Sequence, residues 1–225
     1  MMFKTPILLV VFKRPLLTKK ILSLISNLKA NTLYIAADVP SSKAELKEHN
    51  EVLSIVKAFD GAKNIKLNIA SKPLGLKQRM STAIDWFFKE VEQGIVLEDD
   101  CFPNPSFFPY CEKLLKYYKH DSRIGLICGY NELEQCTTEY SFFYSRIGAC
   151  WGWASWNRAW KSYNDSIEYF KKVADKKYLT HLLGSEIKAN HRIATARKAY
   201  KNEIDSWSYI WTFCRLMNSQ LSIIP

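Results

Sequence analysis

Seven consecutive residues near the start of the chain, PILLVVF at 6–12, carry no polar side chain. A run of this kind is typical of a strand that is buried on both faces, as strands are in a parallel sheet. Apolar residues then recur at helical spacing from Leu17 to Leu28, and a second strand is predicted at Leu33–Ala37. Because parallel strands need a long crossover connection, this order of strand, helix and strand predicts an α/β fold.

The alternation of strand and helix continues as far as residue 128. A capping box at Ser42–Glu45 and the pair Asn104–Pro105 predict the starts of two helices, and apolar residues between 80 and 88 predict another. The further strands that the sequence predicts are Ile65–Ala70, Ile95–Leu97 and Ile124–Cys128. We therefore expect a doubly wound, mostly parallel sheet flanked by helices, with ligands bound beyond the carboxyl ends of its strands.

Beyond about residue 130 the pattern changes to a helical C-terminal subregion. A short β segment is predicted at Ser141–Ser145, followed by three or four helices that end near Leu221. No linker rich in Pro, Gly or Ser separates the two parts, so residues 1–225 are predicted to form a single domain.

The charge balance and the cysteine and histidine patterns narrow the class of protein. The net charge of +10 favours anionic partners, but no nucleic-acid-binding motif is present, so nucleic acid is not expected as a partner. The six cysteines form no C-x-x-C pair and are expected to be reduced and mostly buried, while the four histidines are expected at the surface. The run at 6–12 is too short to span a bilayer and lacks a signal-peptide cleavage site, which predicts a cytoplasmic protein with at most a peripheral contact with the inner membrane.

Three consecutive carboxylates, Glu98, Asp99 and Asp100, directly follow the predicted strand at 95–97. Two like charges about 4 Å apart repel by roughly 1 kcal/mol in water and about 4 kcal/mol near a protein surface, so a positive charge is expected beside them. In an extended backbone, Glu98 and Asp100 share one side and Asp99 points to the other. Such a pair could hold Mg²⁺ or Mn²⁺, which takes one or two protein carboxylates. Alternatively, the three carboxylates cap the next helix or pair with surface lysines.

Several segments carry a family resemblance. In chain order they are PILLVVFKRP, AADVP, SKPLGLKQRMSTAI, GIVLEDDCFPNPSFF, WGWASWNRAW and DSWSYIW. In this order they resemble the nucleotide-diphospho-sugar transferases of the GT-A glycosyltransferase fold, in which Glu98-Asp99-Asp100 stands at the D-x-D or E-D-D motif. The last two segments are similar to bacterial glycosyltransferases of this group and, more distantly, to eukaryotic N-acetylglucosaminyltransferases. The resemblance covers nearly the whole chain.

The resemblance implies roles for residues in both halves of the chain. Residues 1–129 would bind the nucleotide sugar, and residues 130–225 would bind the acceptor and carry catalysis. Asp100 would bind the Mn²⁺ or Mg²⁺ ion that bridges the diphosphate. The residues implied in substrate binding are Glu98 and Asp99 at the sugar or ribose, Arg14 and Asp38 beside the nucleoside, and Gly75 and Lys77 near the ribose or phosphates.

Asp205 precedes an amphipathic helix that carries Ile210 and Trp211. An aspartate in this position is an ordinary N-cap. In inverting enzymes of the resembled family, an Asp or Glu near such a helix start removes the proton from the acceptor hydroxyl, so the resemblance makes Asp205 the catalytic base. One carboxylate could do both, and Glu203 is the second candidate for the base.

Four tryptophans lie within ten residues: Trp151, Trp153, Trp156 and Trp160. Aromatic faces suit the apolar faces of sugar rings, so Trp151 and Trp153 are expected to form a wall for the acceptor or the donor sugar, with core packing as the alternative. The spacing of Trp156 and Trp160 instead suits a helix that is buried against the sheet.

The expected function is a metal-dependent, inverting transfer of a sugar from a nucleotide diphosphate sugar, UDP-linked, to a hydroxyl of a glycan or lipid-linked acceptor. A nucleotidyltransferase is one alternative, but it would need a glycine-rich loop after the first strand, where this chain has FKRP. A non-catalytic nucleotide- or carbohydrate-binding protein is the other. Related enzymes usually continue past a strand at 221–224 and often supply a His metal ligand there. This chain stops at Pro225, so three alternatives stay open. The chain is a fragment, it binds metal more weakly than its relatives, or it has no activity.

Overall fold

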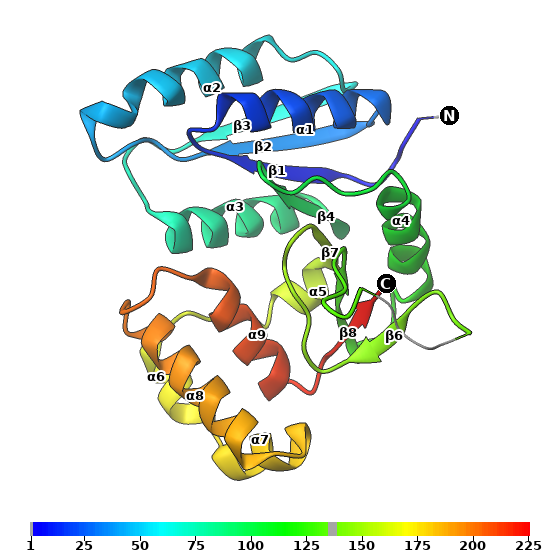
Figure 1. Cartoon of the computed structure of the whole chain (residues 1–225), viewed down its shortest axis with the longest axis vertical. Coiled ribbons are helices and arrows are strands. Elements are labelled where there is room, and N and C mark those ends of the chain that lie inside the picture. The colour runs from blue at the N-terminus through cyan, green and yellow to red at the C-terminus, as the bar shows by residue number, and fades with distance from the viewer. Residues whose placement is uncertain (1, 135–138) are drawn as a thin grey trace.

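A mostly parallel sheet runs through the molecule and is flanked by helices (Figure 1). The computed structural model describes residues 2–134 and 139–225. Within these residues the sheet has eight strands in the order β3-β2-β1-β4-β7-β5-β8-β6. Strands β7 and β6 run antiparallel to their neighbours. The strands are β1 Ile7–Val11, β2 Thr32–Ala37, β3 Asn64–Ile69, β4 Gln93–Glu98, β5 Ile124–Cys128, β6 Phe143–Ser145, β7 Trp153–Trp156 and β8 Leu221–Ile224. The predicted α/β class is confirmed.

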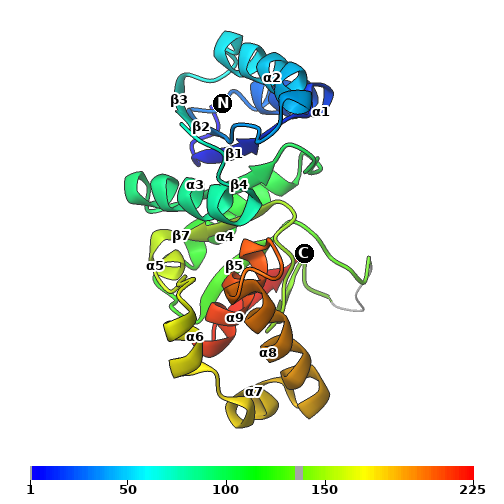
Figure 2. The same ribbon diagram turned by 90° about the vertical axis from the view of Figure 1, so that its left-hand side faces the viewer.

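The helices cover both faces of the sheet. Two apolar cores result, and β1 contributes to both, with Leu8 and Val10 on one face and Ile7, Leu9 and Val11 on the other. On the second of these faces lie α1 Pro15–Asn27, α2 Leu46–Ala58, which follows the 3₁₀ turn η1 Lys43–Glu45, and α4 Phe107–Tyr117. On the first face lie α3 Leu76–Glu90, α5 Asn157–Trp160, α6 Ile167–Val173, α7 Lys176–Leu183, α8 Glu186–Tyr200 and α9 Trp207–Met217. Helices α6 to α8 form the end of the molecule farthest from α1 and α2 (Figure 2).

Strand β7 joins the two halves of the chain in one sheet. It lies antiparallel between β4 and β5, with Ala154 opposite Ile95 on one side and Ile127 on the other. The expectation that Trp156 lies on a helix is therefore wrong. Trp156 ends the strand, where its indole N–H donates to the carbonyl of Leu115. A buried W-A-S-W stretch can be a strand or a helix by composition, and pairing with two neighbouring strands makes it a strand here.

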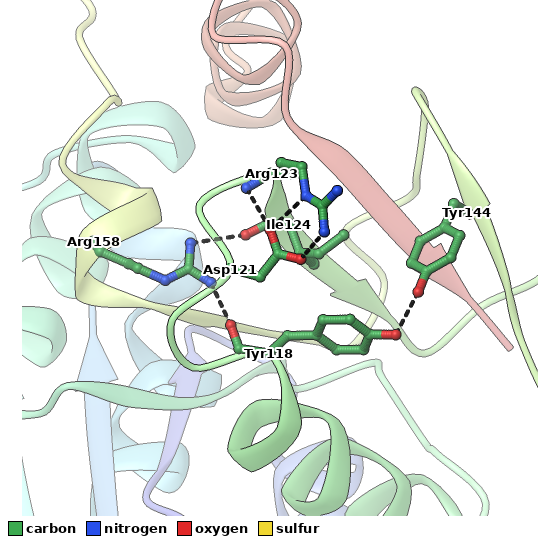
Figure 3. Close-up of polar contacts among 6 residues, drawn as sticks. All are labelled: Tyr118, Asp121, Arg123, Ile124, Tyr144 and Arg158. Atoms are coloured by element: carbon green, nitrogen blue, oxygen red, sulfur yellow. Dashed lines mark hydrogen bonds and ion pairs between the residues drawn. The ribbon is translucent and has the colours of Figure 1, made fainter.

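The turn before β5 is tied to α5 by arginine (Figure 3). Arg158 donates to the carbonyls of Tyr118 and Ile124, both at 2.9 Å, and its guanidinium lies over the ring of Trp156. Within the turn, Asp121 accepts from the backbone and guanidinium of Arg123. These contacts provide hydrogen-bond donors for carbonyls at the end of α4 and the start of β5. They therefore fix the chain at the amino-terminal end of β5, opposite the carboxyl ends of the parallel strands.

Several local predictions need correction. Ser42 and Glu45 do not form the reciprocal backbone bonds of a capping box, because the chain makes the 3₁₀ turn η1 there. Helix α4 begins at Phe107, two residues later than the Asn104–Pro105 pair predicts, since Asn104 accepts from the backbone and hydroxyl of Ser106 in a turn. His49 is buried, not exposed, and faces the carbonyl of Phe12.

The described cysteines are all free, and four of these five are buried, as expected. Cys136 lies outside the described residues. In the part of the chain that the structure describes, no helix is both long and apolar enough to cross a membrane.

Candidate functional site

A cavity of about 510 Å³ opens at the carboxyl ends of β1, β2 and β4. Open α/β folds bind their ligands at this end of the sheet, just beyond the carboxyl ends of the strands. Six of the residues singled out in the sequence line it: Arg14, Asp38, Gly75, Glu98, Asp99 and Asp100. The carboxyl ends of four neighbouring strands, β3, β2, β1 and β4, therefore bring these residues together, although they lie far apart in the chain.

The carboxylates at the end of β4 converge on Arg14. One guanidinium nitrogen, Nη1, lies 2.8 Å from Asp99 Oδ1 and 2.7 Å from Asp100 Oδ2. The expected alternation of sides fails after Glu98, because the backbone turns there and the N–H of Cys101 donates to the carbonyl of Glu98. Arg14 thus supplies the positive charge that the cluster requires.

The environment of each carboxylate differs. Asp99 is only 4% exposed and also accepts from the backbone N–H of Phe12; burial raises its pKa, and Arg14 opposes the rise. The pKa of Glu98 is raised to about 7, first by burial and then by the negative charges of Asp100 and Asp99. The carboxylate of Glu98 makes no hydrogen bond or ion pair with another described residue. It is the member of the cluster that is left without a cation.

Asp38 organises the loop that leads into α3. Its buried carboxylate accepts from the backbone N–H groups of Val39, Leu74 and Gly75. Its direct contacts are thus with the backbone. It also forms part of the cavity wall, and its contact with a nucleoside stays a prediction.

Arg79, which sequence reasoning missed, lies buried in the cavity wall beside Asp38. Its Nη2 donates to the backbone and side-chain oxygens of Asn68, and its Nε has no partner among the described residues. Burial lowers the pKa of this guanidinium, and the charge of Asp38 opposes the effect. Arg79 stands at helical spacing with Ala83 and Phe87, on the apolar side of the predicted helix. A charged residue at such a position is the signal in the sequence that could have revealed it.

Asp205 caps a helix, but not the helix that follows it. Its carboxylate accepts from the backbone N–H groups of Leu76, at 3.0 Å, and Lys77, at 2.8 Å, at the start of α3. The prediction that Asp205 caps α9 is therefore wrong, and Ser206 is the residue at that position. Gly75, with a φ of 79°, takes a left-handed conformation and lies between Asp205 and the cavity. Asp205 is thus adjacent to the cavity wall.

Lys77 and Glu203 are not among the residues that line the cavity. The ammonium of Lys77 donates to the carbonyl of Ala199 and to the side chain of Asn202, at the end of α8. Glu203 is exposed and lies 3.9 Å from Lys201. In this structure Lys77 connects α3 to α8, so its predicted contact with ribose or phosphate would require its side chain to move.

Trp151 and Trp153 lie in different environments. Trp153 is 1% exposed and stacks on Trp207 in the core, so the packing alternative describes it. Trp151 is 63% exposed and meets the ring of Tyr130 edge to face, with 4.8 Å between centroids. A second cavity, of about 410 Å³, lies beside Trp151, and Asp100 lines both cavities.

The carboxylate oxygens at the cavity could supply some of the ligands that a hard divalent cation such as Mg²⁺ needs. Among residues 2–134 and 139–225, no group of three or more His, Cys, Asp or Glu side chains is placed to hold a metal ion. Mg²⁺ and Mn²⁺ in nucleotide sites take one or two carboxylates and complete their shell with phosphate oxygens and water. Asp100, half exposed, and the unpartnered Glu98 are oxygen donors of this kind at the cavity.

The sequence was also compared with models of protein families and with curated proteins, and neither comparison found a match. Our proposal of a function therefore rests on the fold, on the site described above and on the resemblance of the short sequence segments.

Proposed function

We propose that the chain is a GT-A-like glycosyltransferase, which transfers a sugar from a nucleotide diphosphate sugar, UDP-linked, to an acceptor hydroxyl. The observation that carries this proposal is the cavity at the carboxyl ends of β1, β2 and β4, whose rim holds Glu98, Asp99 and Asp100 with Arg14. Its volume of about 510 Å³ lies in the range of small-ligand sites. The resemblance of the sequence to this family supports the same reaction.

The donor would lie along the cavity from β2 to β4. Asp38 and Arg79 line the wall at the nucleoside end, and Arg14 stands at the diphosphate end beside the carboxylates. Asp100, with Glu98, would hold Mn²⁺ or Mg²⁺. A bound divalent ion supplies Lewis-acid stabilisation of the negative charge that develops on the departing nucleoside diphosphate. Arg14 can pair with the same phosphates.

Asp205 is our candidate for the base that removes the proton from the acceptor hydroxyl. The hydroxyl oxygen would attack the anomeric carbon as the bond to the diphosphate breaks, and the proton would pass to the carboxylate. Asp205 lies next to Gly75, which lines the cavity. Each of its oxygens already accepts one backbone hydrogen bond, which leaves further lone pairs for a substrate hydroxyl.

A binding protein without turnover is the second candidate function. The engagement of Asp205 with α3 favours it, because both oxygens of this carboxylate already hold the start of that helix. Turnover of UDP-sugars would exclude this candidate.

A thermal-shift screen with UDP and UDP-sugars, with and without Mn²⁺, tests the proposal. A ligand that binds only the native state stabilises it by about 2.7 kcal/mol at 100 times its Kd. We expect stabilisation by UDP that increases with Mn²⁺, and slow hydrolysis of at least one UDP-sugar. Absence of any shift with every common nucleotide would reject the proposal.

Asp100→Ala tests whether Asp100 binds the metal ion. We expect it to abolish the Mn²⁺-dependent part of the UDP shift, while the melting temperature of the unliganded protein changes little, because Asp100 is exposed and its pairing with Arg14 is worth at most about 1 kcal/mol. Asp60→Ala, in the exposed loop between α2 and β3, is the control and should respond to Mn²⁺ as the parent does. Retention of the Mn²⁺ effect in Asp100→Ala would show that this residue does not bind the ion.

A further inference from the structure

Strand β3 forms one edge of the sheet, and its outer side has no neighbouring strand among the described residues. It is six residues long, contains no proline and pairs with β2 in unbroken register. The strand at the opposite edge, β6, is only three residues long. Proteins usually shorten an edge strand or interrupt it with a bulge, because its free N–H and C=O groups can pair with another chain. Strand β3 is neither short nor bulged, which makes it a candidate for such pairing.

The backbone of β3 turns alternate residues toward the open side. The N–H of Asn64 donates to the carbonyl of Asn31 at 3.0 Å, and the N–H of Ala70 donates to that of Ala37 at 2.9 Å. Backbone groups alternate between the two sides along a strand, so the even-numbered residues of β3 face β2. The N–H and C=O groups of its odd-numbered residues therefore point outward and are available to a further strand.

The odd-numbered residues of β3 also form an apolar stripe. They are Ile65, Leu67 and Ile69, which share one face of the strand. Ile65 packs against the core on the side of α1 and α2, but Leu67 is 42% exposed and Ile69 is 39% exposed. On the other face, Lys66 pairs with Glu90. The open edge thus combines unpaired backbone groups with exposed aliphatic side chains, the two features that a partner strand covers.

The sequence of β3 is complementary to its own reverse. If two copies pair antiparallel about a twofold axis at Leu67, this residue faces its own copy, and Ile65 of each chain faces Ile69 of the other. All three pairs are apolar, and all join residues whose backbone groups point outward. On the opposite face, Lys66 faces the neutral Asn68. An axis one residue earlier would place Lys66 opposite its own copy, and like charges directly opposite each other destabilise a sheet.

We propose that the chain forms a homodimer in which the β3 strands of two copies pair antiparallel, centred on Leu67, and join the two sheets into one. Each of the three outward-facing pairs would exchange two backbone hydrogen bonds. The same edge is used by both copies, so the pairing closes at two chains and leaves no β3 edge for a third. The dimer does not depend on the proposed transferase activity.

Sedimentation velocity of the full chain, from low to high micromolar concentration, tests for the dimer. We expect the parent to be dimeric at the upper end. Leu67→Lys places two positive charges opposite each other and should weaken the dimer at least tenfold. Leu67→Pro removes an outward N–H without breaking a bond to β2, so it should weaken the dimer as well. Ile187→Lys is the control, because it replaces an 83% exposed aliphatic residue on α8, far from β3, and should dimerise as the parent does.

Cysteine cross-linking tests the register of the two strands. Under mild oxidation with a copper phenanthroline complex, Leu67→Cys should form a disulfide-linked dimer, because residues directly opposite in a sheet lie within disulfide range. Asn64→Cys, in the same strand, is the control and should not link to its own copy. A parent that stays monomeric at every concentration rejects the dimer. A dimer that both Leu67→Lys and Leu67→Pro leave intact, or one that links as well through residue 64 as through residue 67, rejects the β3 pairing.

Discussion

At the scale of single residues, the guanidinium of Arg14 occupies the position that a divalent cation would share. Its Nη1 contacts Asp100 Oδ2 at 2.7 Å, so a metal ion on that oxygen would lie next to a like charge. At the proposed metal site, Arg14 would therefore oppose metal binding until the phosphates of an anionic donor drew the guanidinium toward them. By linkage, UDP and Mn²⁺ should each strengthen the binding of the other.

Arg14→Met should increase the affinity for Mn²⁺ in the absence of nucleotide by about fivefold, because removing a repulsion of roughly 1 kcal/mol has that effect. Binding is measured from the electron paramagnetic resonance signal of free Mn²⁺. Lys13→Met is the control, since it removes the same charge from the same cavity but from a side chain that pairs with Glu45. Equal changes in both variants would mean that overall charge, not the contact with Asp100, sets the affinity.

Glu98 should give the protein a pH-dependent loss of stability. Its pKa is raised from the ordinary 4.5 to about 7, so the folded protein holds a proton on Glu98 that the unfolded chain releases. This contribution to the free energy of unfolding is fully present below about pH 4.5 and is lost as the pH rises through 7. Its full size is about 3 kcal/mol.

Glu98→Gln removes that titration and should gain stability over the parent as the pH rises from 5 to 8. Urea unfolding in the presence of EDTA, at several pH values, measures the difference. A difference between the two proteins that stays constant over this pH range would show that Glu98 titrates normally.

At the scale of helices and strands, Asp205 connects two elements that are distant in the chain. It caps α3 from a position just before α9. Asp205→Ala should lower the free energy of unfolding by about 1 kcal/mol, as the loss of an N-cap does, whereas Glu203→Ala should have little effect. Asp205→Asn keeps one acceptor oxygen, so it should stay folded, bind UDP as the parent does and transfer sugar about 10²–10⁴-fold more slowly. A parental rate in Asp205→Asn would place the base elsewhere, with Glu203 examined next.

The elements show which parts of the fold local sequence can predict. The apolar runs that became β1, β2, β4 and β5 were recognised because strands buried on both faces carry no polar residue. Strand β7 was missed, since its identity depends on pairing with β4 and β5 on either side. The cap on α3 was missed for the same physical reason: the partner of Asp205 lies 129 residues away, and spacing along the chain carries no trace of such a contact. The cluster at Glu98–Asp100 was found from three consecutive carboxylates that follow a predicted strand, but its partner Arg14 was assigned to the nucleoside.

At the scale of the whole molecule, the sheet is not divided where the chain changes from strands to helices. Strands from residues 1–129 lie on both sides of β7, which comes from the later part. A fragment of residues 1–129 should therefore leave the edge of β4 unpaired and the first core open to water, and exposed strand edges promote aggregation. We expect this fragment to be insoluble or to associate, as measured by size-exclusion chromatography, whereas a monomeric, cooperatively folded fragment would contradict the expectation.

The position of β7 between β4 and β5 also affects how the sheet can form during synthesis of the chain. Its two partners, β4 and β5, precede Trp153–Trp156 in the chain and are therefore synthesised first. During that interval the nascent chain must hold two apolar strands apart, or let them pair side by side in a parallel arrangement that has to open again. Translation pauses ahead of residue 153, or a chaperone that binds β4 and β5 as they emerge, would then decide how much of the newly made protein reaches the native sheet.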